Sequence, residues 1–202
     1  MNTATTATTT IPRHPMINRP IFSYPGKRQK GFSLLEILIV AGLLAAGLAA
    51  LFFMLNRFNV RAAANNEAEV LNTMAAETRT QFRSQGNYTG VTPAVLIANG
   101  IVPTTHVSGT TIETGWATTV AVAPANLNGT PGDSVSFTYT LPRESCSRFV
   151  QASEGAFSRV NVDGINVKDI PGGARNLNVV TLGTQCNPAA GGNVTVIFTL
   201  GR

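Results

Sequence analysis

The chain has 202 residues, a length that suits one domain with an added element at one end. Hydrophobic residues make up 44% of it and charged residues only 12%, which is more typical of a membrane or secreted surface protein than of a cytosolic enzyme. The net charge of +5 comes entirely from residues 1–31, which hold five basic and no acidic residues. The remainder is neutral, and this argues against a nucleic-acid-binding body.

Residues 1–31 read as a basic leader. They open with the threonine- and proline-rich stretch "MNTATTATTTIPRHP", which is not expected to fold, and they end in Lys27, Arg28 and Lys30. Basic residues directly before an apolar helix keep that end in the cytoplasm, so we expect a cytoplasmic N-terminus and an exported C-terminal part. Translation from Met1 or from Met16 gives the same basic end.

An apolar segment follows the leader. From Ile37 to Leu55 there are 19 residues without a charge or a proline, which as a helix would span about 28 Å, close to the hydrocarbon thickness of a bilayer. A cleaved secretory signal usually has a shorter apolar region, and a one-pass anchor would need no special residues. Neither alternative explains Glu36, because a carboxylate in a membrane helix costs about 2.5–3.5 kcal/mol unless it reaches water or a partner.

The motif around this glutamate resembles a known signal. "KGFSLLEILIV", residues 30–40, is similar to the class III signal of type IV prepilins in its glycine, aromatic residue, "SLLE" and uninterrupted apolar run. The resemblance implies that prepilin peptidase cuts between Gly31 and Phe32 on the cytoplasmic side and that the apolar helix is retained. It also implies that Phe32 is N-methylated and that Glu36 serves subunit assembly.

The chemistry of such a cut supplies a partner for Glu36. Cleavage at Gly31 creates an ammonium group on Phe32, and in lipid an ammonium and a carboxylate are each costly alone but much less so when paired. We therefore hypothesise that the ammonium of one subunit pairs with Glu36 of its neighbour and sets the axial register of assembly.

The helix is predicted to continue past the membrane, from Phe32 to about Arg83, with residues 32–55 as its membrane part. Glu67 counts among the polar residues between the positions of an apolar stripe, and the stretch "SQGNYTG" at 84–90 ends the helix. The stripe has a 4-3-4-3-4 spacing and consists of Ala64, Ala68, Leu71, Ala75, Thr78 and Phe82.

Residues 85–202 are predicted to form a globular head. Thr92 and Pro93 look like the N-cap and first position of a short helix closed at Asn99-Gly100, and "RESCSRFVQAS" at 143–153 reads as a second helix. Alternating patterns predict strands at "TTVAV" around Val120, at 134–141, in a hairpin over 158–167 turned at Asp163-Gly164, at "LNVVTL" (177–182) and at "NVTVIFTL" (193–200).

The chain has two cysteines, Cys146 in the second head helix and Cys186 in a glycine- and proline-rich loop. Two cysteines are too few for a structural zinc site. In an exported head a disulfide is the natural interpretation, and two free buried thiols are the alternative. A bridge that closes a loop of about 40 residues would stabilise the fold by roughly 4 kcal/mol.

The overall layout resembles the type IV pilin fold. This is an α+β fold with a long N-terminal helix on a mostly antiparallel sheet and a C-terminal disulfide-bounded region, here divided into a leader (1–31), a helix (32–84) and a head (85–202). The long leader, the short helix after the long one and the helix inside the cysteine loop resemble the type IVb branch, which includes bundle-forming and conjugative pili. Phe32 as the first mature residue resembles type IVa instead.

Catalysis is not expected. His14 lies in the leader and His106 stands alone near a loop, and no Ser/His/Asp or Cys/His arrangement is recognisable. No cofactor or metal is expected either, because "DGINVKD" at 163–169 lacks the ligand spacing of a calcium loop and reads as a hairpin. Trp116 is expected in the core or at a subunit interface.

The sequence thus predicts a structural subunit that is inserted in the inner membrane as a precursor and then assembled into an extracellular pilus. Its expected partners are identical subunits, prepilin peptidase and the inner-membrane assembly machinery, and the filament would serve adhesion, aggregation or conjugation. The alternatives are a type II secretion pseudopilin, a minor pilin at the tip, or a membrane-anchored DNA-uptake protein, which would need a basic head.

Overall fold

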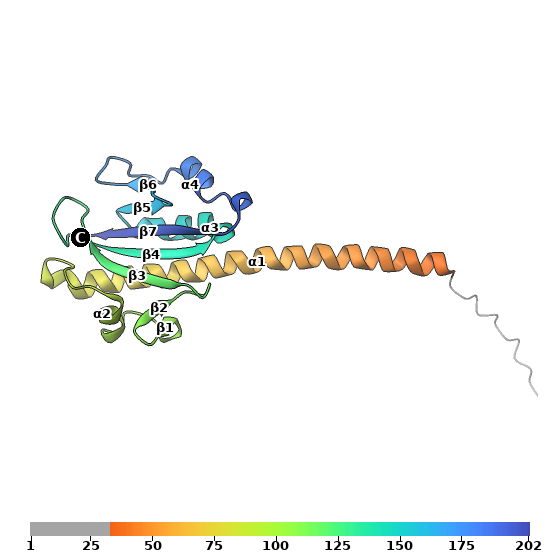
Figure 1. Cartoon of the computed structure of the whole chain (residues 1–202), viewed down its shortest axis with the longest axis horizontal. Coiled ribbons are helices and arrows are strands. Elements are labelled where there is room, and N and C mark those ends of the chain that lie inside the picture. Colours follow the sequence, from red (N-terminus) through yellow and green to blue (C-terminus); the bar gives the residue numbers. More distant parts are fainter. Residues whose placement is uncertain (1–32) are drawn as a thin grey trace, which may run out of the picture. The chain divides into compact units, whose positions relative to one another are not determined.

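The computed structural model describes residues 33–202 (Figure 1). The chain divides into two compact units, Met1–Ala45 and Ala46–Arg202. The elements are α1 (Leu34–Phe82), η1 (Arg83–Gln85), α2 (Pro93–Ala98), η2 (Thr104–His106), β1 (Val107–Ser108), β2 (Thr111–Glu113), β3 (Thr119–Ala125), β4 (Ser134–Pro142), α3 (Arg143–Ser153), η3 (Glu154–Ala156), β5 (Arg159–Val162), β6 (Ile165–Asp169), α4 (Val179–Gln185), η4 (Pro188–Ala190) and β7 (Asn193–Gly201).

Helix α1 ends at Phe82, next to the predicted end at about Arg83, whereas the predicted start at Phe32 lies outside the described residues. At its start the carbonyl of Ser33 accepts the backbone N–H groups of Glu36, at 2.9 Å, and of Ile37, at 3.2 Å. At its end the chain tightens into η1 and then turns at Gly86, whose φ of 75° lies in the left-handed region that glycine adopts without strain.

The seven strands form one sheet in the order β1-β2-β3-β4-β7-β5-β6, and all neighbouring strands are antiparallel. The longest pairing joins β4 to β7, from Ser134 opposite Gly201 to Pro142 opposite Asn193. The β5–β6 hairpin turns at Asp163 (φ 48°) and Gly164 (φ 86°), and positive φ at both positions is the signature of a type I′ turn. The predicted hairpin is therefore confirmed.

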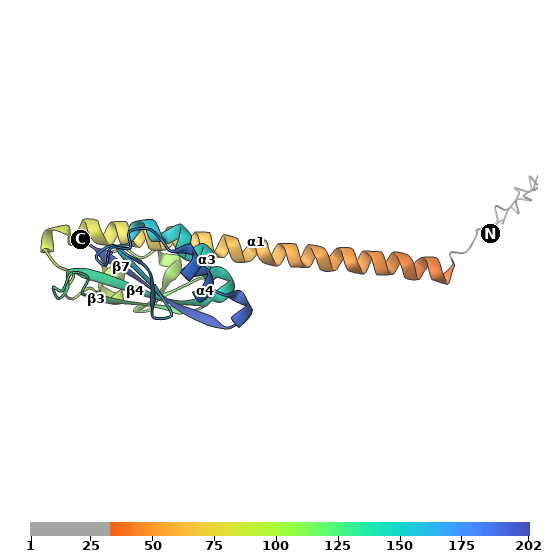
Figure 2. The same ribbon diagram turned by 90° about the horizontal axis from the view of Figure 1, so that it is seen from above.

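The core lies between the sheet and the C-terminal half of α1. Figure 2 shows this half of α1 and helix α3 lying along the same face of the sheet. All six residues of the predicted stripe are buried, and Met74 joins them. Opposite them the strands alternate buried and half-exposed positions, so that β4 contributes Val135, Phe137, Tyr139 and Leu141 to the core.

The head helices confirm two predictions and correct a third. Helix α2 has Thr92 as its N-cap, whose hydroxyl accepts the N–H of Val95 at 3.3 Å, and α3 spans the predicted residues 143–153. The strand predicted at 177–182 is wrong, because Val179–Gln185 forms helix α4. Asn178 caps this helix by accepting the N–H of Thr181 at 3.0 Å, and this local bond outweighs the strand propensity of the β-branched residues.

Two smaller differences concern the edges of the head. The short strands β1 and β2 were not predicted, because two or three residues carry too little alternation to be recognised. Cys186, expected in a loop, is the C-cap residue of α4.

Candidate functional site

The first part of α1 presents an apolar surface that nothing in the described chain covers. The large apolar side chains from Leu34 to Phe52 are all exposed, from 51% at Val40 to 79% at Phe52. Within residues 33–202, Leu34–Phe52 is the one helical stretch long and apolar enough to cross a membrane. An apolar surface of this size is typical of a membrane or protein interaction site.

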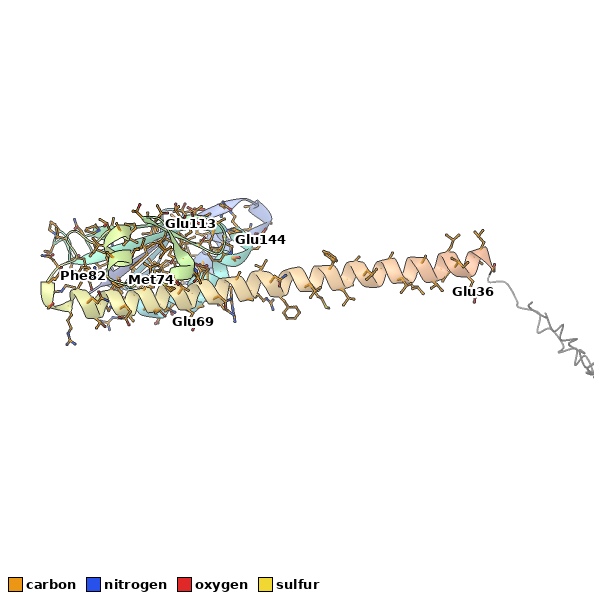
Figure 3. The ribbon with its side chains drawn as sticks, turned by 90° about the horizontal axis from the view of Figure 1, so that it is seen from below. Glu36, Glu69, Met74, Phe82, Glu113 and Glu144 are labelled. Carbon is orange, nitrogen blue, oxygen red and sulfur yellow. A yellow bond between two sulfur atoms is a disulfide. The ribbon has the colours of Figure 1, made fainter. Side chains whose placement is uncertain are left out.

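Glu36 lies in the first turn of this apolar helix (Figure 3). Its neighbours Leu35 and Ile37 are 67% and 58% exposed, so the carboxylate is set in an apolar surface. It makes no hydrogen bond or ion pair with any residue in 33–202, although the positive end of the helix dipole favours an acid at this position. Gly31 and Phe32 lie outside the described residues, so the proposed charge pair stays a prediction.

Gly42 and Gly47 lie within the apolar segment at positions where the described structure does not require a glycine. A Cβ atom built on either residue would meet no atom within 4 Å, and neither has a positive φ. No contact in the described chain therefore requires a glycine at these positions. A role for them would lie in contacts beyond the described residues, since small residues let membrane helices approach closely.

The predicted disulfide is present between Cys146 of α3 and Cys186 at the end of α4. The two Cα atoms are 5.4 Å apart and both residues are buried. Arg143, in the first turn of α3, strengthens this link. Its guanidinium donates to the carbonyl of Gln185 and, at 2.7 Å, to the carboxylate of Asp163 in the hairpin turn. Two helices and a hairpin thus meet at one corner of the head.

Glu67 and His106 correct two predictions. Glu67, predicted between the positions of the apolar stripe, is only 4% exposed, and His106 does not stand alone, because its Nε2 lies 3.1 Å from Oε1 of Glu67. The same oxygen accepts the backbone N–H of Gly115, whereas Oε2 has no partner in residues 33–202. Spacing could have revealed this position, since Glu67 lies three residues after Ala64 and four before Leu71, on the apolar stripe.

Trp116 follows Gly115 and packs on the core from its edge. Its ring meets that of Phe149 edge-to-face, with centroids 5.4 Å apart. No group of three His, Cys, Asp or Glu side chains within residues 33–202 could hold a metal ion.

A long N-terminal helix with an apolar first half, an antiparallel head sheet and a C-terminal disulfide together define a type IV pilin-like protein. Comparison with known families identifies it further. The family described as PilS N terminal matches residues 61–201, and the prokaryotic N-terminal methylation motif matches residues 26–52. The chain therefore belongs to the PilS N-terminal family of type IV prepilins, whose fold is that of a non-enzymatic subunit.

Solved structures and curated sequences complete the comparison. Nine solved chains match, among them the crystal structure of TcpA, a type IV pilin from Vibrio cholerae El Tor biotype. That match has a TM-score of 0.46 and 21% sequence identity, and it covers 69% of this chain and 96% of the TcpA chain. A search of curated protein sequences found no match.

Proposed function

We propose that this chain is a structural subunit of a type IV pilus, of the type IVb branch. Prepilin peptidase cuts it after Gly31, and identical subunits then polymerise into an extracellular filament. The observation that carries the proposal is Glu36, an acid without a partner in the described chain, at the start of an exposed apolar helix and five residues after the glycine of the motif.

The proposal divides the chain into a leader at 1–31, a helix at 32–84 and a head at 85–202. The precursor sits in the inner membrane with its basic leader in the cytoplasm and its head outside, as the cluster of Lys27, Arg28 and Lys30 favours. A disulfide between Cys146 and Cys186 fits an oxidising compartment outside the cytoplasm.

Polymerisation follows from what happens to the apolar surface when a subunit leaves the membrane. Side chains such as Leu51 and Phe52 are 58% and 79% exposed, and each gains about 1.5–3 kcal/mol when it is fully buried away from water. Nothing in the described chain covers them, so the first halves of neighbouring α1 helices must cover one another. The apolar segments then form the filament core and the heads its surface.

The charge pair sets the register of this packing. The N-methylated ammonium of Phe32 in one subunit pairs with the carboxylate of Glu36 in the next, because either charge alone is costly in lipid. Packing of apolar surfaces is non-directional and fits many registers, whereas the ion pair forms only where these two groups meet. Adhesion, aggregation or conjugation would then be properties of the assembled filament.

The experiment compares the unmodified chain with two variants, each expressed with prepilin peptidase and the assembly machinery. Intact-mass spectrometry of the unmodified chain should give a mature protein that begins at N-methylated Phe32, and electron microscopy should show long filaments. Glu36→Val should keep that mature mass but form no filaments. Glu69→Val, which removes an exposed acid further along α1, should keep both.

Two outcomes would contradict the proposal. Normal filaments from Glu36→Val would refute the charge pair, and a mature protein that begins beyond Leu55 would refute retention of the apolar helix. Filaments that stay short would instead favour a type II secretion pseudopilin.

A further inference from the structure

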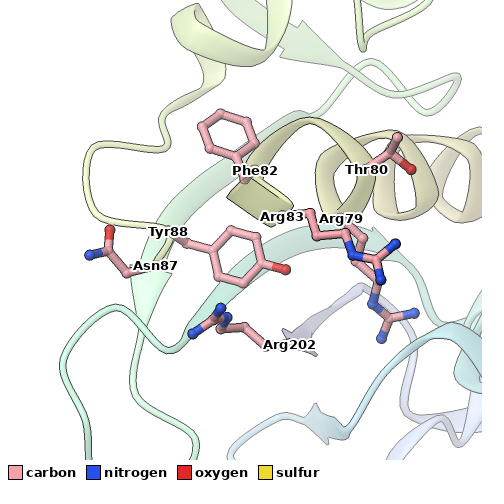
Figure 4. Close-up of a pocket in the computed structure, with 7 residues that line it drawn as sticks. All are labelled: Arg79, Thr80, Phe82, Arg83, Asn87, Tyr88 and Arg202. Carbon is pink, nitrogen blue, oxygen red and sulfur yellow. The ribbon is translucent and has the colours of Figure 1, made fainter. Parts of the chain in front are cut away.

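A pocket of about 420 Å³ lies at the C-terminal end of α1 (Figure 4). Three arginines line it. Arg79 and Arg83 come from the last turn of α1 and from η1, and Arg202 directly follows β7. The aromatic residues Phe82 and Tyr88 form part of the same lining.

No Asp or Glu side chain of the described residues pairs with the arginines of this pocket. None of the three guanidinium groups has an Asp or Glu carboxylate within 4.0 Å among residues 33–202. Arg79 donates to the carbonyl oxygens of Ala156, at 2.8 Å, and of Gly201, at 3.3 Å, but these acceptors are neutral. Like charges gathered without a counter-charge repel one another, and a bound anion would relieve this repulsion.

Tyr88 adds a fourth donor. Its hydroxyl points toward the arginines (Figure 4), and its ring is buried against Phe82 with centroids 6.3 Å apart. Its backbone N–H donates to the carbonyl of Gly132 at 2.8 Å, which holds the residue in place. Burial raises the pKa of the Tyr88 phenol above its usual value, and the nearby charges of Arg79 and Arg202 only partly oppose this. The hydroxyl therefore keeps its proton at neutral pH.

The helix dipole explains only part of the cluster. Basic residues near the end of a helix interact favourably with its carbonyl groups, which accounts for Arg79 and Arg83. It does not account for Arg202, which arrives from the end of β7, or for the hydroxyl of Tyr88. The four residues share another property, since each lines the same pocket and carries N–H or O–H donors.

We infer that this pocket binds a compact oxyanion, namely a phosphate, sulfate or carboxylate group. Guanidinium groups match the oxygens of such ions with paired N–H donors, and hydrogen bonds between charged groups are the strong ones. The site belongs to the single subunit and does not rest on assembly or on processing at Gly31. If the proposed function failed, the anion site would therefore still stand. If the anion site failed, the proposed function would still stand.

The test titrates the full chain in detergent with sodium phosphate, sulfate or acetate at constant ionic strength, with chloride as the reference salt. We expect saturable shifts of the backbone amide NMR signals around Arg83 and Tyr88. Arg83→Gln should weaken the affinity about tenfold, because it removes a charge-assisted donor from the pocket. The Arg83 side chain forms no hydrogen bond or ion pair with another residue in 33–202, so its loss should not disturb the fold. Arg175→Gln is the matched control, since it removes an exposed arginine outside the pocket and should bind as the unmodified chain does.

A comparison of these titrations identifies the kind of molecule that carries the anion. N-acetylneuraminic acid, which carries a carboxylate on a sugar, is titrated beside acetate. Tighter binding of the sugar acid supports the site and assigns it to a saccharide-borne group, and equal binding supports the site for free ions. A response that grows without saturation, or one that is equal in the Arg83→Gln and Arg175→Gln variants, means an adventitious ion only and overturns the inference.

Discussion

Tyr139 places a hydroxyl group in the middle of the core, where no atom of residues 33–202 forms a hydrogen bond with it. Its ring is fully buried and packs against Phe149, at a centroid distance of 5.1 Å, and Phe198, at 6.2 Å. Burial raises the pKa of this phenol well above its usual value of 10.0, and the negative charge of Glu67 raises it further. A buried hydroxyl without a partner costs about 1–3 kcal/mol.

Replacement by phenylalanine should therefore stabilise the protein. Because the pKa of Tyr139 is higher in the folded than in the unfolded chain, its ionisation opposes folding: the stability is unaffected below pH 10 and falls as pH rises above 10 toward the folded-state pKa. We expect Tyr139→Phe to raise the free energy of unfolding at pH 7 by about 1 kcal/mol and to reduce its loss above pH 10. Urea unfolding in detergent, followed by the fluorescence of Trp116, measures both effects.

The matched control for this prediction is Tyr88→Phe, which removes a hydroxyl at the edge of the head. It should leave the larger part of the alkaline loss in place, because Tyr139 is the more deeply buried of the two. Destabilisation of Tyr139→Phe at pH 7 would mean that the hydroxyl has a partner.

At the scale of elements, α4 depends on its connections. It buries Leu182 and the adjoining Cys186, whereas Val179 and Val180 are 61% and 78% exposed. A helix of seven residues is marginal in isolation, so its stability comes from its cap, its buried residue and the bond to α3. The disulfide is therefore the main constraint on this corner of the head.

Loss of the disulfide should destabilise the head and loosen α4 first. The bridge closes a sequence separation of 40 residues, so the double variant Cys146→Ala/Cys186→Ala should lower the free energy of unfolding by about 4 kcal/mol. Amide hydrogen exchange should rise most over residues 179–185. A reducing agent should lower the stability of the unmodified chain to a similar value and should not affect the double variant. Equal stability with and without the bridge would contradict the prediction.

At the scale of the whole molecule, charge and hydrophobicity are separated along the sequence. Residues 1–31 carry all of the net charge, the next stretch is apolar, and the remainder is neutral. The basic cluster before the apolar segment is larger than the pair Arg57 and Arg61 behind it. This asymmetry favours export of the C-terminal part.

Removal of the basic cluster before the apolar segment should change the orientation of the chain in the membrane. Alkaline phosphatase fused after Arg202 is active only outside the cytoplasm, so the fusion to the unmodified chain should be active. Replacement of Lys27, Arg28 and Lys30 by Gln should lower this activity and also the fraction of Cys146–Cys186 disulfide. Replacement of Arg57 and Arg61 by Gln is the control and should leave both unchanged. Unchanged activity in the triple variant would refute control by the basic cluster.

Local signals in the sequence were sufficient for most of the elements. The stripe from Ala64 to Phe82, the cap at Thr92 and the turn at Asp163-Gly164 each depend on residues a few positions apart, and the structure confirms all three. The expected export of the C-terminal part and the presence of two cysteines in it were likewise enough to predict the disulfide. The motif from Gly31 to Glu36 identified the family by itself, because its residues are contiguous.

Only the tertiary structure decided the features built from distant residues. The contact of Glu67 with His106 joins positions 39 residues apart, and the pocket gathers Arg79 and Arg83 from the end of the long helix and Arg202 from the end of the head. At 177–182 the β-branched residues favoured a strand, but the cap and the burial of Leu182 favoured a helix. Spacing in a sequence reports neighbours on one element, whereas contacts between elements are set by how their surfaces pack.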